Sequence, residues 1–109
     1  GAMGLGEAQS LTGDTTKYHT FGAVFDGTLT GNANRLKFRY DGVQQTLNFG
    51  ATTVGTATSG ASTTLYFGTN SNASAFYNGY IGEILVWTRT LNLAECLQVE
   101  NYLKTKWAL

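Results

Sequence analysis

The sequence predicts an all-β domain, an antiparallel β-sandwich with one C-terminal α-helix. Most of the chain consists of short β-type runs separated by turns rich in Gly, Asn and Thr. Residues 80–88 are almost continuously apolar, as in a central strand that is covered on both faces. The amphipathic stretch 92–107 follows directly, so a single closing helix is expected to pack on a β body.

The first clear strand covers residues 16–25, which are rich in aromatic and β-branched residues and end at the turn pair Asp26-Gly27. Residues 35–40 alternate strictly between charged and apolar side chains. In a strand, this alternation places Leu36, Phe38 and Tyr40 on a core face and the three basic residues on a wet face. The basic residues are Arg35, Lys37 and Arg39.

A tight hairpin is expected at Asp41-Gly42, because both central residues of such a turn need positive φ. Residues 43–47 should form the returning strand. Residues 48–64 are rich in Gly, Ala, Thr and Ser, with Val54 as the one sizeable aliphatic residue, and predict a loop with one short strand. Another strand is expected at residues 65–67, before a polar loop over 69–79.

The C-terminal helix has recognisable start and stop signals. Asn92 can cap its N-terminus, and Glu95 lies three residues later, as in a capping box. Lys104 and Lys106 suit the negative end of the helix dipole. The expected buried face carries four side chains, namely Cys96, Val99, Leu103 and Trp107.

The composition disfavours several classes of function and site. The formal net charge is zero, and 13% of the residues are charged, which disfavours a nucleic-acid or anionic-membrane binder. The single cysteine, Cys96, excludes an internal disulfide and multi-cysteine metal sites. No run reaches the roughly 18 apolar residues of a membrane span. Residues 1–4 are interpreted as an expression-tag remnant and residues 5–109 as a single domain.

Several motifs resemble, in order, the later segments of laminin G-like, concanavalin A-like jelly-roll domains. They are residues 18–27, 40–42, 65–68, 77–84 and 91–107. The last two resemble the end of bacterial and phage members, in which a helix follows the final strand. This resemblance implies a jelly roll and a carbohydrate-binding or adhesive role. Residues 1–15 offer little counterpart to the family's early strands, so the domain is expected to be a compact variant or truncated at its N-terminal side.

No enzyme is expected. Glycoside hydrolases need a pair of carboxylates, but Glu83 stands alone on its predicted strand and is interpreted as a half-buried group bonded to backbone or Arg89. His19 is the sole histidine and has no triad or zinc motif around it. No cofactor is expected, although loop oxygens leave calcium as an alternative. Its candidate ligands are Asp14, Asp26, Asn70 and Asn72.

The aromatic loop is the candidate binding site. Sugars combine apolar C–H faces with hydroxyl groups, so aromatic platforms beside amide side chains suit them. The candidate ligand-binding residues are Asn70, Asn72, Phe76, Tyr77, Asn78 and Tyr80. The competing interpretation is that Phe76 and Tyr77 only cover the end of the sandwich.

Two functions therefore remain. The first is a non-catalytic carbohydrate-binding or adhesion module whose partner is a glycan or cell-surface ligand. The second is a structural or interaction domain of a phage virion or cell-surface protein that assembles with partner chains. A domain short of strands would expose an apolar sheet face, so a homo-oligomer or contact with the rest of a parent protein is expected. Both functions imply an extracellular, cell-surface or virion location.

Overall fold

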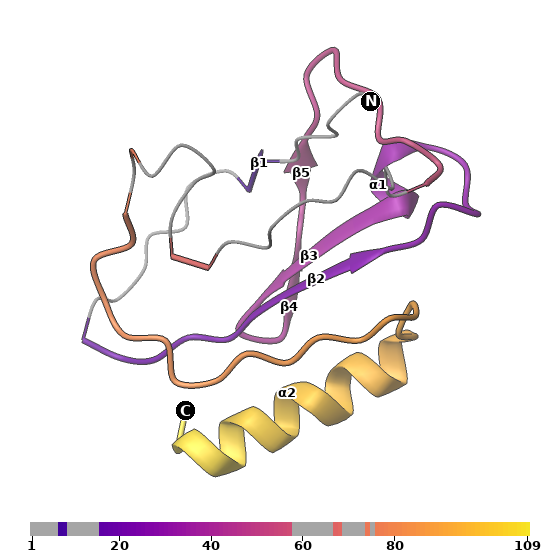
Figure 1. The fold of residues 1–109 in the computed structure, drawn as a ribbon. Coiled ribbons are helices and arrows are strands. Elements are labelled where there is room, and N and C mark those ends of the chain that lie inside the picture. The colour runs from indigo at the N-terminus through magenta and orange to yellow at the C-terminus, as the bar shows by residue number, and fades with distance from the viewer. Residues whose placement is uncertain (1–6, 9–15, 58–66, 69–73, 75) are drawn as a thin grey trace.

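The computed structural model describes residues 7–8, 16–57, 67–68, 74 and 76–109. The elements in this part of the chain are β1 (Glu7–Ala8), β2 (Phe21–Phe25), α1 (Asn32–Arg35), β3 (Leu36–Tyr40), β4 (Val43–Gln45), β5 (Leu47–Asn48) and α2 (Leu93–Trp107). Figure 1 shows α2 lying below an open sheet, with residues 80–90 running between them.

One antiparallel sheet has the strand order β2-β3-β4, and a separate two-stranded ladder pairs β1 with β5. The predicted hairpin is confirmed: Tyr40 pairs with Val43 across a turn in which Asp41 and Gly42 have φ of 48° and 84°. β2 begins at Phe21 and is shorter than the predicted strand, while Phe25 pairs with Leu36. The helix α1 was not predicted.

The prediction of an all-β jelly-roll sandwich is wrong. The chain is a small α/β domain with one open sheet, and the described residues contain no second sheet packed face to face on the first. The predicted central strand 80–88 forms no ladder, and most of its side chains are exposed. Continuous apolarity made this segment resemble a buried strand, but a strand also requires a hydrogen-bonded neighbour. The predicted strand 65–67 lies mostly outside the described residues.

α2 is confirmed with its capping box. The Asn92 side chain accepts from the Glu95 amide at 3.0 Å, and the Glu95 carboxylate accepts from the Asn92 amide at 2.9 Å. The helix ends at Trp107 and is followed by the cap residue Ala108, which has the left-handed conformation with φ of 51°. On the face predicted to be buried, Cys96, Val99 and Leu103 are half-buried and Trp107 is 36% exposed, so the face is less buried than expected.

The helix covers the sheet face that the sequence predicted to be exposed to solvent. α2 packs on the face that carries Arg39, which pairs with Glu100, and both residues are only 8% exposed. Arg39 also donates to the Gly42 carbonyl, so its charge and hydrogen-bonding groups are satisfied under the helix. Lys37 lies on the same face and is half-buried. The basic face of β3 is therefore covered rather than wet, because α2 supplies a matching carboxylate.

Residues 52–56 attach to α1 through side-chain bonds that the loop prediction did not include. Asn32 donates to the Thr52 carbonyl at 2.7 Å and accepts from the Val54 amide at 2.9 Å. Arg35 donates to the Val54 carbonyl at 2.8 Å, and Val54 is 4% exposed. Gly27 packs so closely on this segment that a Cβ atom there would overlap the Thr56 carbonyl. Residues 52–56, which have few apolar side chains to bury, are thus held to α1 by hydrogen bonds.

The capping box predicts a specific acid sensitivity. The Arg89 guanidinium, assisted by the Asn92 amide, lowers the pKa of Glu95 from its ordinary value of 4.5 to about 2. A lowered pKa means that the ionised group stabilises the fold above its unfolded-state pKa and loses this effect as the pH falls through the folded pKa. We therefore expect wild type to be more stable than Glu95→Gln near neutral pH, and this difference to vanish between about pH 4.5 and pH 2.

Chemical denaturation of both variants, followed by far-UV circular dichroism at a series of pH values, measures the difference. The other carboxylates titrate in both variants, so their contributions cancel. A difference that persists undiminished at pH 2 would contradict the assignment.

Candidate functional site

The predicted aromatic site is an exposed surface. The structure places Phe76, Tyr77 and Tyr80 at 72%, 60% and 85% exposure, and Asn78 between them is also exposed. Asn70 and Asn72 lie outside the described residues. The exposure of Phe76 and Tyr77 argues against the interpretation in which they only cover the end of a sandwich. We call residues 76–80 the aromatic segment.

Two glycines hold the aromatic segment in place. The Tyr77 amide donates to the Gly68 carbonyl at 2.7 Å, and Gly68 has a φ of 73°. The Tyr77 ring lies over Gly79, because a Cβ atom on Gly79 would lie only 2.7–2.8 Å from ring and hydroxyl atoms of Tyr77. A larger residue at position 79 would therefore displace the ring. The Tyr77 ring therefore lies close to the backbone at Gly79 while 60% of the residue stays exposed.

A second group of aromatic residues lies around Glu83, close in sequence to the aromatic segment. The Glu83 carboxylate accepts from the Tyr102 hydroxyl at 3.0 Å and from the Trp107 indole at 3.1 Å, and it pairs with Lys106 at 3.0 Å. The Trp107 ring also packs against Gly82, and its centroid lies 5.9 Å from that of Tyr18. These bonds, led by that from the indole, lower the pKa of Glu83.

The prediction that Glu83 bonds to backbone or Arg89 is therefore wrong in its partners. Arg89 instead pairs with Glu95, at 2.7 Å. Sequence reasoning also missed Tyr18, Tyr102 and Trp107 as surface aromatics. The spacing of Tyr102 and Lys106, four residues apart on a helix, was the available signal that they share a face.

His19 has the hydrogen-bond partner that was expected of it. Its Nδ1 lies 2.7 Å from the Asp41 carboxylate, which also accepts from the Thr20 amide at 2.8 Å. Burial would raise the pKa of Asp41, but the bonds from His19 and Thr20 outweigh it and lower the pKa. These contacts attach the hairpin tip to the residues that precede β2. His19 and Asp41 therefore have a structural role.

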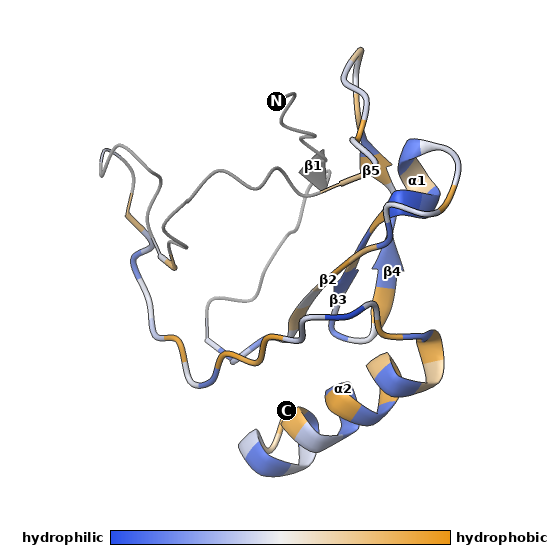
Figure 2. Cartoon of the chain, turned by 45° about the vertical axis from the view of Figure 1, so that its right-hand side comes forward, coloured by the Kyte–Doolittle hydropathy of each residue, from blue (hydrophilic) through white to orange (hydrophobic). Residues whose placement is uncertain are grey.

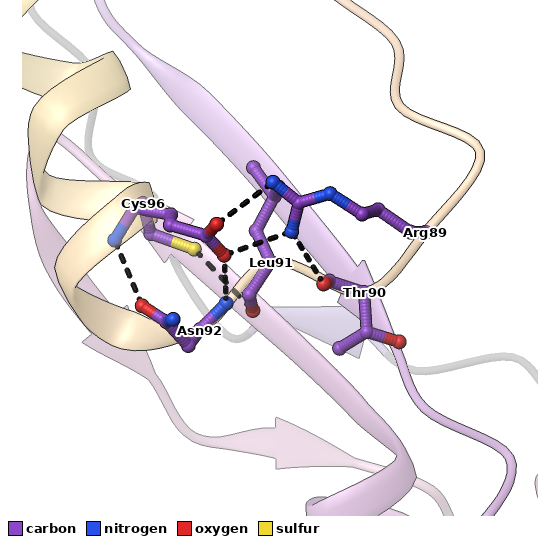
Figure 3. Close-up of polar contacts among 6 residues, drawn as sticks. Arg89, Thr90, Leu91, Asn92 and Cys96 are labelled. Carbon is purple, nitrogen blue, oxygen red and sulfur yellow. Dashed lines mark hydrogen bonds and ion pairs between the residues drawn. The ribbon is translucent and has the colours of Figure 1, made fainter.

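A groove of about 520 Å³ lies between the sheet and the first turn of α2. Its walls include Val24, Asp26 and Lys37 on one side and residues 89–93 on the other. Figure 3 shows the α2 side of this groove, where Arg89 reaches the Glu95 carboxylate and the Thr90 carbonyl. The sequence did not predict this groove, because it depends on which sheet face the helix covers.

Asp26 is the one candidate calcium ligand that lies in the part of the chain described by the structure. Asp26 accepts from the Thr28 hydroxyl at 2.6 Å and the Thr28 amide at 3.0 Å, while Asp14, Asn70 and Asn72 lie outside that part. The described residues also contain no group of three or more His, Cys, Asp or Glu side chains that could hold a metal. No helix among them is both long and apolar enough to cross a membrane.

Comparisons with protein-family models, curated proteins and solved structures found no match to this chain. The resemblance of its motifs to laminin G-like domains therefore stays a prediction.

Proposed function

We propose that this chain is a non-catalytic carbohydrate-binding or adhesion module whose ligand surface is the aromatic segment. The supporting observation is the exposure of Phe76, Tyr77 and Tyr80 within five residues of one another. Aromatic rings provide flat apolar faces for the C–H groups of a sugar, and Asn78 adds an amide for its hydroxyls. The zero net charge fits a neutral ligand. A glycan partner also implies an extracellular, cell-surface or virion location.

A glycan array probed with the labelled wild-type chain tests this function. We expect binding to a subset of neutral glycans, with little dependence on salt, because stacking and neutral hydrogen bonds should dominate. Binding that requires sulfated or polysialylated glycans and disappears at moderate salt would contradict a neutral aromatic site. Absence of binding to every glycan would refute the function itself.

A second function, assembly with partner chains, is favoured by the apolar face of the sheet, which lies opposite the face that α2 covers. This face carries Phe21, Phe38, Tyr40 and Val43, and Phe21 and Val43 are 59% and 62% exposed. Figure 2 shows the hydropathy of the strands: apolar and polar residues alternate along β3, whereas β2 consists of apolar residues and one glycine. No charged residue of the three strands shares the face with Phe38, so two copies can meet there without like-charge repulsion.

A homodimer suits this face because a two-fold axis places the same patch of each copy face to face, so apolar side chains meet apolar side chains. We therefore propose a second copy of this chain as the occupant of the face that carries Phe38.

Light scattering over a hundredfold dilution tests this assembly. Wild type is expected to give the mass of a dimer, and Phe21→Glu to shift it toward the monomer, because two carboxylates would be buried at the interface. Val86→Glu is the matched control, since Val86 is 68% exposed and lies outside the sheet. A wild-type monomer at every concentration would contradict the homodimer.

A further inference from the structure

The groove between the sheet and α2 differs from the aromatic segment in shape and chemistry. Its volume of about 520 Å³ lies in the range of small-molecule sites. Val24, Leu91 and Leu93 supply apolar surface, whereas Asp26, Lys37 and Gln44 supply polar groups. The groove therefore combines apolar contact with hydrogen-bonding groups in a concave site, which the aromatic segment does not offer.

Most charges in the groove are compensated by protein partners. Arg89 forms two bonds to Glu95, and Arg39 is paired with Glu100 beneath the helix. The two charges without such a pair are Asp26 and Lys37, whose charged atoms form no ion pair within 4.0 Å among the described residues. They balance each other electrostatically, so the groove does not select for a net charge on its ligand.

Asp26 and Lys37 keep hydrogen-bonding capacity for a ligand. Both bonds from Thr28 end on Oδ1 of Asp26, so Oδ2 has no hydrogen-bond partner among the residues described. Gln44, which lies opposite Arg39 in β4, likewise makes no side-chain hydrogen bond there. Adjacent sugar hydroxyls donate to a carboxylate and accept from an ammonium or amide group, which is the set of groups that this wall presents.

We propose that this groove is a second carbohydrate site, which takes one neutral sugar residue with its hydroxyls toward Asp26, Lys37 and Gln44. The inference rests on the proposed function for its ligand class, but it uses different residues.

The test is a titration of the ¹⁵N-labelled chain with methyl glycosides of glucose, galactose, mannose and N-acetylglucosamine, followed by amide chemical shifts. At least one glycoside should move the amides of Val24, Lys37 and Leu91 in a saturable way. Asp26→Asn should weaken this binding about tenfold, because it removes a charge-assisted hydrogen bond while keeping the size of the side chain.

Adjacent residues of β4 provide the matched control. Gln44→Ala should weaken binding in the groove about fivefold, whereas Gln45→Ala should leave it unchanged because Gln45 lies opposite Phe38 on the other face. Amide shifts confined to the aromatic segment would overturn the groove site and leave the proposed function intact. Groove shifts that survive Asp26→Asn unchanged would also overturn the assignment. Shifts in the groove without any in the aromatic segment would support the second site and refute the first.

Discussion

Glu100→Ala is expected to lower the free energy of unfolding by about 3–5 kcal/mol, because it leaves the Arg39 guanidinium buried without a counter-charge. Glu100 accepts from Arg39 through both carboxylate oxygens, and each residue is only 8% exposed. The hydrogen bond to Glu100 raises the pKa of Arg39 in the wild type. In Glu100→Ala that bond is lost, but an arginine side chain stays protonated in proteins, so the guanidinium cannot escape this cost by losing its proton. Urea denaturation of wild type and variant measures the loss.

The double variant Arg39→Met/Glu100→Leu is the control for this prediction. Replacing a buried pair by apolar groups of similar volume often costs little, so the double variant should recover most of the stability that Glu100→Ala loses. This outcome would show that Glu100→Ala loses stability because Arg39 is left as an unpaired buried charge, and not because packing contacts are removed. A Glu100→Ala variant within about 1 kcal/mol of wild type would mean that α2 does not pack on the Arg39 face.

The sequence correctly predicted the hairpin turn and the start of α2, because the geometry of both depends only on residues close by in the sequence. The Asp41-Gly42 hairpin follows from the need for positive φ, and the start of α2 follows from the reciprocal bonds of Asn92 and Glu95. Both are determined within four or five residues. Sequence alone was therefore sufficient for them.

Predictions that depended on distant partners were wrong. The alternation in β3 correctly divides its side chains into two faces, but it cannot tell which face receives a helix. Glu100 lies 61 residues from Arg39, so nothing near β3 indicated that Arg39 would be buried. For the same reason, residues 80–88 were assigned to a strand although no ladder forms there. The sandwich prediction depended on that strand.

The candidate binding site stays a prediction. Phe76, Tyr77, Asn78 and Tyr80 were identified by residue type, and their exposure agrees with a binding surface. Asn70 and Asn72 lie outside the described residues, so their place in the site stays a prediction. The groove beside Asp26 could not be predicted, because it forms only where α2 meets the sheet.

Tyr77→Ala is expected to weaken glycan binding by about 2 kcal/mol, roughly 30-fold, because it removes an exposed aromatic ring from the proposed surface. Its effect on the free energy of unfolding should stay below about 1 kcal/mol, since Tyr77 is 60% exposed. Tyr77→Phe keeps the ring and its contact with Gly79, so this conservative variant should retain most of the affinity.

The most direct measurement is isothermal titration of wild type, Tyr77→Phe and Tyr77→Ala with the glycan that binds best on the array, beside their thermal unfolding curves. Binding through the aromatic segment predicts that affinity falls steeply only in Tyr77→Ala while all three unfold at similar temperatures. Full affinity in Tyr77→Ala would place the ligand elsewhere on the chain. Unfolding of that variant at much lower temperature would instead show that Tyr77 is part of the core.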